Sequence, residues 1–550
     1  MSHKFHHLIN NLPVDSKQTF LSRNSSNLSD VLGEFPIADK AQVRAACLAA
    51  HAAATQWRNT PAPVRGEIIG NMGAAIAREK EALSQLVTRE MGKTLREARG
   101  DVQEAIDTCH FFQSEGRRLY GQTVPSEMQR KELFTYRRPL GVVAIVTAGN
   151  FPIAVPSWKI IPALLTGNTI VWKPSEDCPA SSYAFAKLME EAGLPAGVLN
   201  VVFGGGKEST GQWLVEMMDE RVATQTSPPT PLPKGEGSKA FPLQGGGLGG
   251  GKLIHKFAFT GSTAVGRQIG EAAGRNLITP TLELGGKNPL VVMRDADLDN
   301  AVSGAIWASF GTGGQRCTSA GNLIVDAPVF AEFKKRFLAA AKAIKIGDPN
   351  LHPNVLYGPF ISEKFFRAWE KHYAIGEKDG AKLLHGAGRI TQSNKPKGFV
   401  GNPAAAFYGW PTVWEAKPGM AIFQQETFGP TINLVKVNGI DEAIATANAV
   451  DYGLSSAIYT NNREWAYQFK NEIEAGMTSI NNSTTGAEAH LPFGGIKGSG
   501  NGTRESGIWV IESYTYWQAV NDDISGKLQL AQMETGYIAP KAAFDVGALT

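Results

Sequence analysis

Hydrophobic and polar residues follow three different patterns along the chain. Residues 38–87 and 95–119 place apolar side chains at helical spacing, which predicts long helices. Short runs rich in Val, Ile and Phe alternate with helical segments over residues 141–274 and again over residues 288–480. Alternation of this kind is typical of βαβ crossovers, so the sequence predicts an α/β fold with parallel sheets covered by helices on both faces. Residues 1–35 are polar and weakly patterned.

The first alternating block has the clearest pattern. Its expected strands cover residues 141–148, 168–174, 197–204 and 257–262, and its expected helices cover 156–167, 180–193, 208–218 and 263–274. The second block opens with a strand at residues 288–293. A separate β-rich stretch, residues 513–520, lies near the end of the chain. The chain is long enough for two or three domains with cores of their own.

One segment, Thr224–Lys252, interrupts the first block. It is dominated by Gly and Pro and holds one aromatic residue, so it cannot bury enough apolar area to offset its ordering entropy. We expect a disordered surface loop, which a fold tolerates because the cost of loop closure grows slowly with length. Gly245, Gly247 and Gly250 match the GxGxxG dinucleotide pattern there. No strand precedes them and no helix follows, so we reject that match.

Composition narrows the class of protein. The 550 residues carry a net charge of only +3, which gives no argument for nucleic acid or for an anionic membrane as a partner. The N-terminus lacks the apolar core of a secretory signal, and the uncharged run Leu140–Trp158 contains prolines that suit a strand and a loop better than a membrane span. We expect a cytoplasmic protein without a metal site, because the four cysteines are far apart and form no CxxC pair: Cys47, Cys109, Cys178 and Cys317.

Cys317 is the first candidate for chemistry. A cysteine in an arbitrary position is most often a small buried hydrophobe. Here the surrounding GTGGQRCTSAG is rich in Gly and polar residues, and Arg316 stands directly before the thiol. A neighbouring cation favours the thiolate, which is the nucleophilic form, although a neighbour in sequence need not point at the sulfur.

Two further residues supply the other parts of a thiol acyl-transfer site. Asn150 follows an expected buried strand, where its side-chain amide can donate a hydrogen bond to a developing oxyanion. Taken alone, Asn150 fits an Asx turn as well. Glu283 ends a β-like run before two glycines, where a carboxylate can have a raised pKa and act as a general base. Spacing alone does not distinguish Glu283 from a surface glutamate.

Several motifs suit a dinucleotide. Lys173 and Glu176 follow the strand at 168–174, where an acidic group can accept hydrogen bonds from a ribose diol. Gly261 and Ser262 open a helix after a strand, where backbone N–H groups suit a diphosphate, although Gly-Ser is also ordinary helix capping. A turn at 425–430 adds an acid and an aromatic that are weak signals by themselves: Glu426 and Phe428.

Taken together, these motifs resemble the aldehyde dehydrogenase superfamily. The segments GNFP, WKPSE, FTGST, ELGGKNP, GQRC, ETFGP and LPFGG occur in that family's order, over roughly residues 25–520 apart from the insertion. The resemblance implies Cys317 as nucleophile, Asn150 and the Cys317 backbone N–H as oxyanion hole, and Glu283 as the base that activates water. It implies cofactor-binding roles for Lys173, Glu176, Gly261, Ser262, Glu426 and Phe428, and a substrate-tunnel position for Phe493.

The resemblance also implies an architecture. It consists of a Rossmann-like cofactor domain, an α/β catalytic domain and a small β oligomerisation element that makes a homodimer or homotetramer. Here the cofactor domain would comprise residues 1–120 and 141–285 and the catalytic domain residues 286–504. The oligomerisation element would comprise 121–140 and 505–525, followed by a tail at 526–550. The family binds its dinucleotide without a standard GxGxxG, and Glu176 favours NAD over NADP.

The resemblance implies oxidation of a small-molecule aldehyde to a carboxylic acid, through a thiohemiacetal and a thioester on the cysteine. One alternative is a semialdehyde or phosphorylated-aldehyde dehydrogenase whose anionic substrate is held by Arg316, since an arginine can bind such a group in a bidentate way. A structural hydrogen-bonding role suits Arg316 equally. A CoA-acylating enzyme or a non-catalytic scaffold fits less well, because Glu283, Asn150 and Cys317 are all present.

Overall fold

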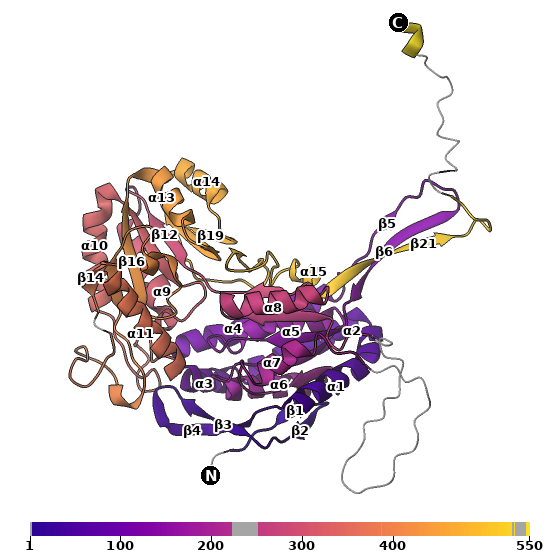
Figure 1. Ribbon diagram of the computed structural model, residues 1–550, viewed down its shortest axis with the longest axis horizontal. Helices are drawn as coiled ribbons and strands as arrows, with labels where there is room; N and C mark the ends of the chain where they lie inside the picture. Colours follow the sequence, from indigo (N-terminus) through magenta and orange to yellow (C-terminus); the bar gives the residue numbers. More distant parts are fainter. Residues whose placement is uncertain (1–2, 223–250, 387, 531–532, 534–545, 550) are drawn as a thin grey trace.

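The computed structural model describes residues 3–222, 251–386, 388–530, 533 and 546–549 (Figure 1). Two α/β units lie side by side, and each is built on a seven-stranded sheet of described residues. A β arm projects from the first unit. The predicted α/β fold with helices on both faces of parallel-rich sheets is therefore confirmed.

The first sheet has the strand order β11-β10-β7-β8-β9-β1-β2. Its five strands from β11 to β9 are parallel, and β1 and β2 add an antiparallel edge. The predicted strands of the first block all belong to it. The bounds are β1 (His7–Ile9), β2 (Leu12–Val14), β7 (Val142–Val146), β8 (Thr169–Lys173), β9 (Leu199–Val201), β10 (Lys256–Thr260) and β11 (Thr281–Glu283).

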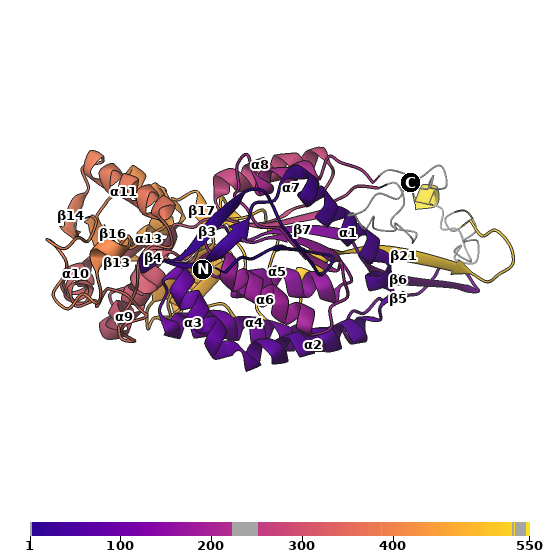
Figure 2. The same cartoon turned by 90° about the horizontal axis from the view of Figure 1, so that it is seen from below.

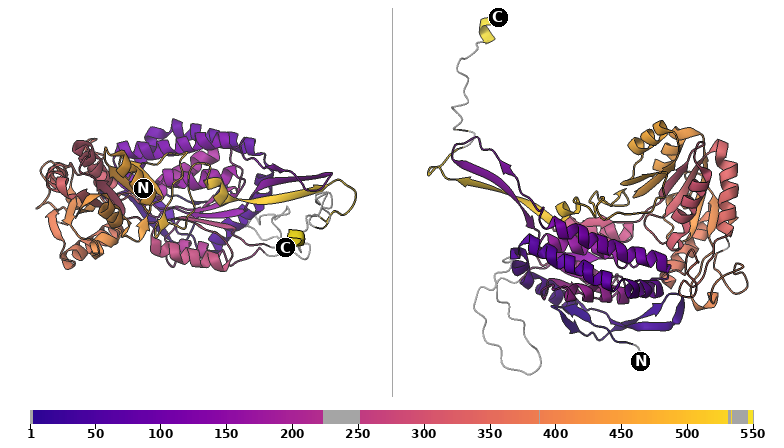
Figure 3. Two further views of the ribbon diagram at one scale, coloured as in Figure 1. Left: turned by 90° about the horizontal axis from the view of Figure 1, so that it is seen from above. Right: turned by 180° about the vertical axis from the view of Figure 1, so that it is seen from behind.

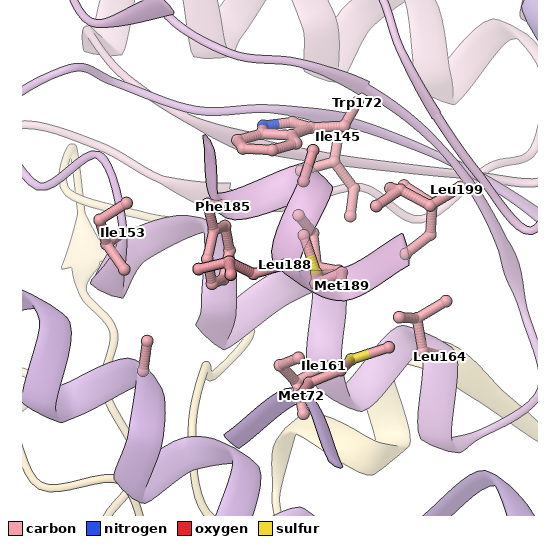
Figure 4. Close-up of a cluster of buried hydrophobic side chains, with 14 of the residues drawn as sticks. Met72, Ile145, Ile153, Ile161, Leu164, Trp172, Phe185, Leu188, Met189 and Leu199 are labelled. Carbon is pink, nitrogen blue, oxygen red and sulfur yellow. The ribbon is translucent and has the colours of Figure 1, made fainter. Parts of the chain in front are cut away.

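Two layers of helices bury this sheet. Val143 and Ile145 of β7 pack into the core shared with one layer, whereas Val142 and Ala144 pack into the core shared with the other, as the two-residue period of a strand requires. Figure 2 shows the layers on opposite sides of the strands, and Figure 4 shows part of the first core around Trp172. The first layer is α2 (Ala62–Arg78), α3 (Lys80–Met91), α4 (Leu95–Glu115), α5 (Ala154–Leu165) and α6 (Pro179–Glu191), and the second is α1 (Lys40–Asn59), α7 (Thr210–Glu216) and α8 (Thr263–Arg275).

The second sheet has the order β14-β15-β16-β13-β12-β18-β19, parallel except at β14. Helices α9 and α10 cover one face, and α13 and α14 cover the other. The strands are β12 (Asn288–Val292), β13 (Ala320–Asp326), β14 (Lys382–His385), β15 (Thr412–Glu415), β16 (Thr431–Val437), β18 (Ser455–Tyr459) and β19 (Met477–Ile480). The helices are α9 (Leu298–Phe310), α10 (Ala327–Lys342), α11 (Glu363–Lys378), α12 (Ala421–Gln424), α13 (Gly439–Asn448) and α14 (Arg463–Glu472).

The N-terminal region is more regular than its sequence suggests. Besides β1 and β2, residues 1–35 supply most of the hairpin of β3 (Thr19–Asn24) and β4 (Asn27–Pro36). Strands of three residues are too short to show a period, and the hairpin is largely half-exposed, so neither pattern could be recognised in the sequence.

The β arm consists of β5 (Thr123–Val124), β6 (Lys131–Pro139) and β21 (Thr515–Asp523), all antiparallel (Figures 1 and 3). The β-rich stretch expected at 513–520 is a strand only from residue 515, because α15 (Val510–Tyr514) ends immediately before it. Tyr516 and Trp517 expose about half of their surface on this arm. The limits of the domains and the oligomerisation role of the arm stay predictions.

The insertion leaves and re-enters the first unit at one place. Arg221 and Lys252 form an isolated β-bridge, and the N–H of Val222 donates to the carbonyl of Gly251 over 3.0 Å. Gly251 and Lys252, which the sequence assigns to the disordered loop, are thus paired with the chain that precedes it. Residues 223–250, which include the rejected glycines Gly245, Gly247 and Gly250, lie outside the described residues. Most of the predicted tail lies outside them as well.

Candidate active site

Cys317 lies in a tight loop between α9 and β13. Thr312, Gly313 and Gly314 all have positive φ angles, between 53° and 69°, so the chain turns sharply there. A side chain on Gly314 would also clash with the backbone of Gly429, which explains the glycine. The turn leaves Cys317 half-buried against an apolar cluster that includes Phe493.

A cavity of about 690 Å³ opens onto Cys317. Helix α4 forms one wall, and α5 and α9 add aromatic side chains. Phe493, predicted as a substrate-tunnel residue, lines the cavity and packs on Trp158 with ring centroids 4.7 Å apart. A cavity of this size, mostly apolar with a reactive thiol in its wall, suits a small organic substrate.

Asn150 reaches the loop that carries the thiol. Its side-chain amide donates a hydrogen bond to the backbone carbonyl of Gln315 over 2.9 Å, two residues before Cys317. Asn150 is buried, so its amide is held in one orientation. The second N–H of the same amide remains for another acceptor, and the predicted oxyanion role of Asn150 stays a prediction.

Glu283, at the end of β11, is buried and only 3% exposed. Its carboxylate has no side-chain hydrogen-bond partner among the described residues, and the backbone N–H of Gly495 approaches it as a donor. Burial, followed by the negative charge of Glu505, raises the pKa of Glu283 well above its ordinary value. An ideal Cβ on Gly494 would lie 2.7 Å from Oε1 of Glu283, so the glycine leaves room for the carboxylate.

Arg316 is engaged by groups other than the thiol. It forms an ion pair with Glu97 at 2.7 Å, and its Nε donates to the hydroxyl of Thr312 over 2.8 Å. Burial, and then the charges of Glu283 and Glu426, raise the pKa of the Cys317 thiol to about 12. The resting sulfur is therefore a protonated thiol that a base must activate.

The candidate dinucleotide residues occupy the carboxyl ends of the first sheet. At the end of β8, Nζ of Lys173 lies 3.2 Å from Oε2 of Glu176, and Lys364 of α11 lies 3.6 Å from the other oxygen. Glu176 is thus held between two cations and remains partly exposed. Ser262 caps α8, and Gly261 directly precedes the cap. This helix start follows β10, two strands from β8 in the sheet.

Glu426 lies in the second unit, just after α12. The backbone N–H of Gly286 donates to Glu426 over 3.2 Å, and burial raises the pKa of Glu426 to about 7. Phe428 packs against Phe365 at 5.4 Å. Three features together suit a dinucleotide: the partly exposed carboxylate of Glu176 at a strand end, the start of helix α8, and the carboxylate of Glu426 in the second unit. These residues are assigned to it as a prediction.

Comparison with known proteins identifies the family. A sequence model described as "Aldehyde dehydrogenase family" matches residues 14–227 and 245–520. The chain belongs to the aldehyde dehydrogenase family. It is 36% identical over 504 residues to an α-ketoglutarate semialdehyde dehydrogenase of Haloferax volcanii, covering 91% of this chain and 94% of that one. It is 33% identical over 505 residues to a glutarate-semialdehyde dehydrogenase of Pseudomonas putida, covering 92% and 94%.

A solved structure agrees. An NAD-dependent aldehyde dehydrogenase from Sinorhizobium meliloti superposes with a TM-score of 0.83 at 30% identity, covering 96% of each chain. The predicted family, fold and enzyme class are therefore confirmed: this aldehyde dehydrogenase is an oxidoreductase that acts on aldehyde groups. Other relatives are named as NADP+ enzymes, so the family leaves the choice between NAD and NADP open. No helix among the described residues is long and apolar enough to cross a membrane.

A buried charged group near Glu283 has no counterpart among the residues that the sequence singles out in this aldehyde dehydrogenase. Glu505 forms an ion pair with Lys159, and both are almost fully buried. Lys256 lies near this pair. Burial, and then the positive charge of Lys159, lower the pKa of Lys256 to about 7. The three residues come from three separate segments of the chain, and no local motif links them to Glu283.

Replacing Glu505 by glutamine should shift the pH profile to lower pH. A base works in its ionised form, and the negative charge of Glu505 raises the pKa of Glu283. Removing that charge lowers the pKa of Glu283, so the acid limb of a kcat-against-pH profile moves to lower pH. Glu512→Gln, at an exposed position, should leave the limb in place. An acid limb that stays fixed or moves upward in Glu505→Gln, with the melting temperature preserved, would contradict this prediction.

Proposed function

We propose that this aldehyde dehydrogenase oxidises an aldehyde to the carboxylic acid with NAD+ through covalent intermediates on Cys317. The observation that carries the proposal is a half-buried thiol in the wall of a cavity, with the amide of Asn150 hydrogen-bonded to the loop that carries the thiol and the buried carboxyl of Glu283 near enough for its charge to raise the pKa of Cys317. Each of the three side chains comes from a different part of the chain, which a merely structural role does not require.

The first step is activation of the thiol. The high pKa of Cys317 requires a proton acceptor, and the raised pKa of Glu283 suits that group to take the proton. The sulfur then adds to the aldehyde carbon to give a thiohemiacetal. The amide of Asn150 and the backbone N–H of Cys317 stabilise the oxyanion, and such a donor is typically worth ~3–4 kcal/mol.

The second stage releases the product. The bound dinucleotide supplies the acceptor for the hydride that leaves the thiohemiacetal. A thioester on Cys317 remains, and Glu283 in its ionised form takes a proton from the water that attacks it. The carboxylic acid and the free thiol are the products. This sequence uses Glu283 twice, and each time the carboxylate must return its proton.

The test is a spectrophotometric assay. The full chain is mixed with NAD+ and a panel of straight-chain aldehydes and semialdehydes, and NADH is followed by its absorbance. We expect NADH and one equivalent of acid for at least one aldehyde. An acyl-CoA product after CoA is added would favour the acylating alternative. The absence of NADH with every aldehyde would support the scaffold alternative.

We further propose that NAD+ is the preferred cofactor, supported by the carboxylate of Glu176. A 2′-phosphate on the adenosine ribose would meet this negative charge, whereas a diol can donate to it. Lys173 and Lys364 partly offset the repulsion.

Replacing Glu176 by glutamine should therefore reduce the preference for NAD+ over NADP+ by about 10-fold, or ~1.4 kcal/mol. The readout is the Kd of NADH and NADPH from fluorescence titration without aldehyde. Glu363→Gln, an exposed neighbour of Lys364 with its own arginine partner, is the control. An unchanged ratio in Glu176→Gln would contradict the assignment.

A semialdehyde is the second candidate substrate, supported by the names of the relatives. Arg316 lines the cavity, as the alternative requires, but its ion pair with Glu97 occupies one edge of the guanidinium. Arg96 also lines the cavity and has no ion-pair partner among the described residues. Succinic, aminoadipic and oxoglutaric semialdehydes therefore belong in the first panel.

We propose a homodimer or homotetramer, supported by the β arm. An antiparallel ribbon that projects from the molecule with exposed aromatic side chains needs a partner surface. The chain's cytoplasmic location is likewise a proposal, supported by four free cysteines.

A further inference from the structure

Glu97 on α4, in the first unit, contacts the loop of the second unit that carries Cys317. It is the third residue of its helix, where it closes a capping box with Thr94. Its side chain is buried and lines the substrate cavity, yet the proposed chemistry does not use it. A buried carboxylate is costly unless it is paired and hydrogen-bonded, so its partners indicate its role.

Five hydrogen bonds end on this carboxylate. Oε1 accepts from the backbone N–H of Thr312 over 2.7 Å, from the hydroxyl of the same residue over 2.8 Å and from Nη2 of Arg316 over 2.7 Å. Oε2 accepts from the backbone N–H of Thr94 over 3.1 Å and from its hydroxyl over 2.8 Å. An ionised carboxylate accepts on both oxygens, whereas an amide in its place would always turn its NH₂ group toward donors.

Arg316 completes a closed ring of hydrogen bonds directly before the thiol. Its Nε donates to the hydroxyl of Thr312 over 2.8 Å, so that hydroxyl gives its own proton to Glu97. The guanidinium also lies over the ring of Trp307 at 4.6 Å. Burial alone would raise the pKa of Glu97, but the charge of Arg316 and the threonine hydroxyls outweigh it and hold the pKa below its ordinary value. Glu97 is therefore ionised at neutral pH.

Thr312 is the strained member of this ring. Its φ of 53° and ψ of 25° lie in the left-handed region, which is unfavourable for a β-branched residue. Such a conformation persists where the surrounding structure enforces it. Glu97 holds both the backbone and the side chain of Thr312, from a helix that is packed into the core of the first unit. Gly313 and Gly314 adopt their positive φ angles at little cost, so Thr312 is where the loop needs support.

We propose that Glu97 is a positioning residue for the nucleophile: through Thr312 and Arg316 it holds the loop at 312–317 in the conformation that presents Cys317 to the cavity. The inference rests on the proposed function, in which Cys317 is the nucleophile. Arg316 then serves the loop rather than an anionic group of the substrate. A buried ion pair adds little to stability compared with apolar packing, but it fixes one geometry, and a nucleophile requires a fixed geometry.

Replacing Glu97 by glutamine tests the proposal in the full chain. The amide has the size of the carboxylate but cannot accept on both sides, so the loop should lose its conformation while α4 stays folded. We expect kcat to fall by about 100-fold, with the KM of the aldehyde and the Kd of NADH changed by less than about 3-fold. A kcat equal to that of the wild type would overturn the proposal.

Glu115→Gln is the matched control. Glu115 is the last residue of the same helix, and it is likewise a buried carboxylate paired with an arginine, Arg118. It lies 18 residues after Glu97, or about 27 Å at ~1.5 Å per residue. We expect its kcat to match that of the wild type. A loss as large as that of Glu97→Gln would mean that any buried charge on α4 has this effect, and the proposal would fail.

A second substitution separates positioning from folding. Glycine adopts the left-handed conformation without the penalty of a Cβ, so Thr312→Gly added to Glu97→Gln should raise kcat by about 10-fold over Glu97→Gln alone. A protein that had merely lost stability would gain nothing, because glycine makes the unfolded chain more favourable. A double variant no faster than Glu97→Gln would contradict the role given to Thr312 and with it the proposal.

Labelling of the thiols gives a readout without aldehyde or cofactor. Iodoacetamide is added to the full chain, and mass spectrometry follows each cysteine separately. In Glu97→Gln we expect Cys317 to react at least about 5-fold faster, because a loosened loop brings the thiol out of its apolar surroundings. The other three cysteines are buried and should react as slowly as in the wild type: Cys47, Cys109 and Cys178.

The labelling also keeps this inference apart from the proposed function. An unchanged rate at Cys317 would overturn the proposal even if aldehydes are oxidised. Faster labelling of all four cysteines would reveal general unfolding and would overturn it as well. If Cys317→Ser still oxidises aldehydes, the proposed function fails, and the labelling of Glu97→Gln still decides whether Glu97 holds the loop.

Discussion

Replacing Cys317 by serine should abolish aldehyde oxidation, with a loss in kcat of ~10⁴-fold or more. The proposed reaction has two covalent intermediates on this sulfur, the thiohemiacetal and the thioester. A serine hydroxyl is a far poorer nucleophile beside the same base. The burst of NADH in a rapid-mixing experiment should vanish with the steady-state rate. Binding of NADH, measured by fluorescence, should stay close to that of the wild type.

Cys178→Ser is the matched control for this substitution. Cys178 is a buried cysteine at the N-cap of α6, where serine is a preferred residue, so the change should be tolerated. Its activity should remain near that of the wild type. Turnover that survives in Cys317→Ser, or is lost equally in Cys178→Ser, would refute the assignment of the nucleophile.

Replacing Glu283 by glutamine should trap the enzyme after oxidation. The amide is similar in size but cannot accept a proton, so hydrolysis of the thioester should slow by ~10²–10⁴-fold. Intact-protein mass spectrometry should then detect an acyl group on the protein after aldehyde and NAD+ are added. The first turnover should also be slower than in the wild type, because the thiol has lost its proton acceptor, but about one NADH per site should still form before the steady state becomes very slow.

The control carboxylate, Glu488, lines the cavity that opens onto Cys317. Its side chain is exposed, so Glu488→Gln should leave deacylation unchanged. A Glu283→Gln enzyme that loses the burst together with the steady state would show that the carboxyl is needed before the thioester forms. A Glu283→Gln enzyme with normal turnover would remove Glu283 from the mechanism.

The parts of the fold that the sequence predicted well are those with a local signal. The helices of residues 40–115 and the alternating strands carry many apolar positions at a fixed period, and the structure agrees with them. The N-terminal strands β1 to β4 were missed because each is short or half-exposed. Their pairing depends on neighbours such as β9 rather than on their own pattern.

The candidate site divides in the same way. Cys317, Asn150 and Glu283 stand in recognisable motifs, and the structure brings them to one region, although their roles stay predictions. The sequence did not reveal the direction of Arg316, because that depends on Glu97, more than two hundred residues earlier. It did not reveal Glu505 beside Glu283 either. Long-range partners of this kind are set by the tertiary fold. The same partners determine the pKa values of Glu283 and Cys317, which the sequence alone therefore does not give.

The β-bridge between Arg221 and Lys252 has a practical consequence. Because Arg221 and Lys252 pair directly, the chain leaves and re-enters the first unit at adjacent positions. The structure around these two positions therefore does not depend on the length of the chain that joins them. The junction is therefore a natural place for engineering: an affinity tag or a fluorescent domain could replace the intervening sequence without stretching the neighbouring strand β10.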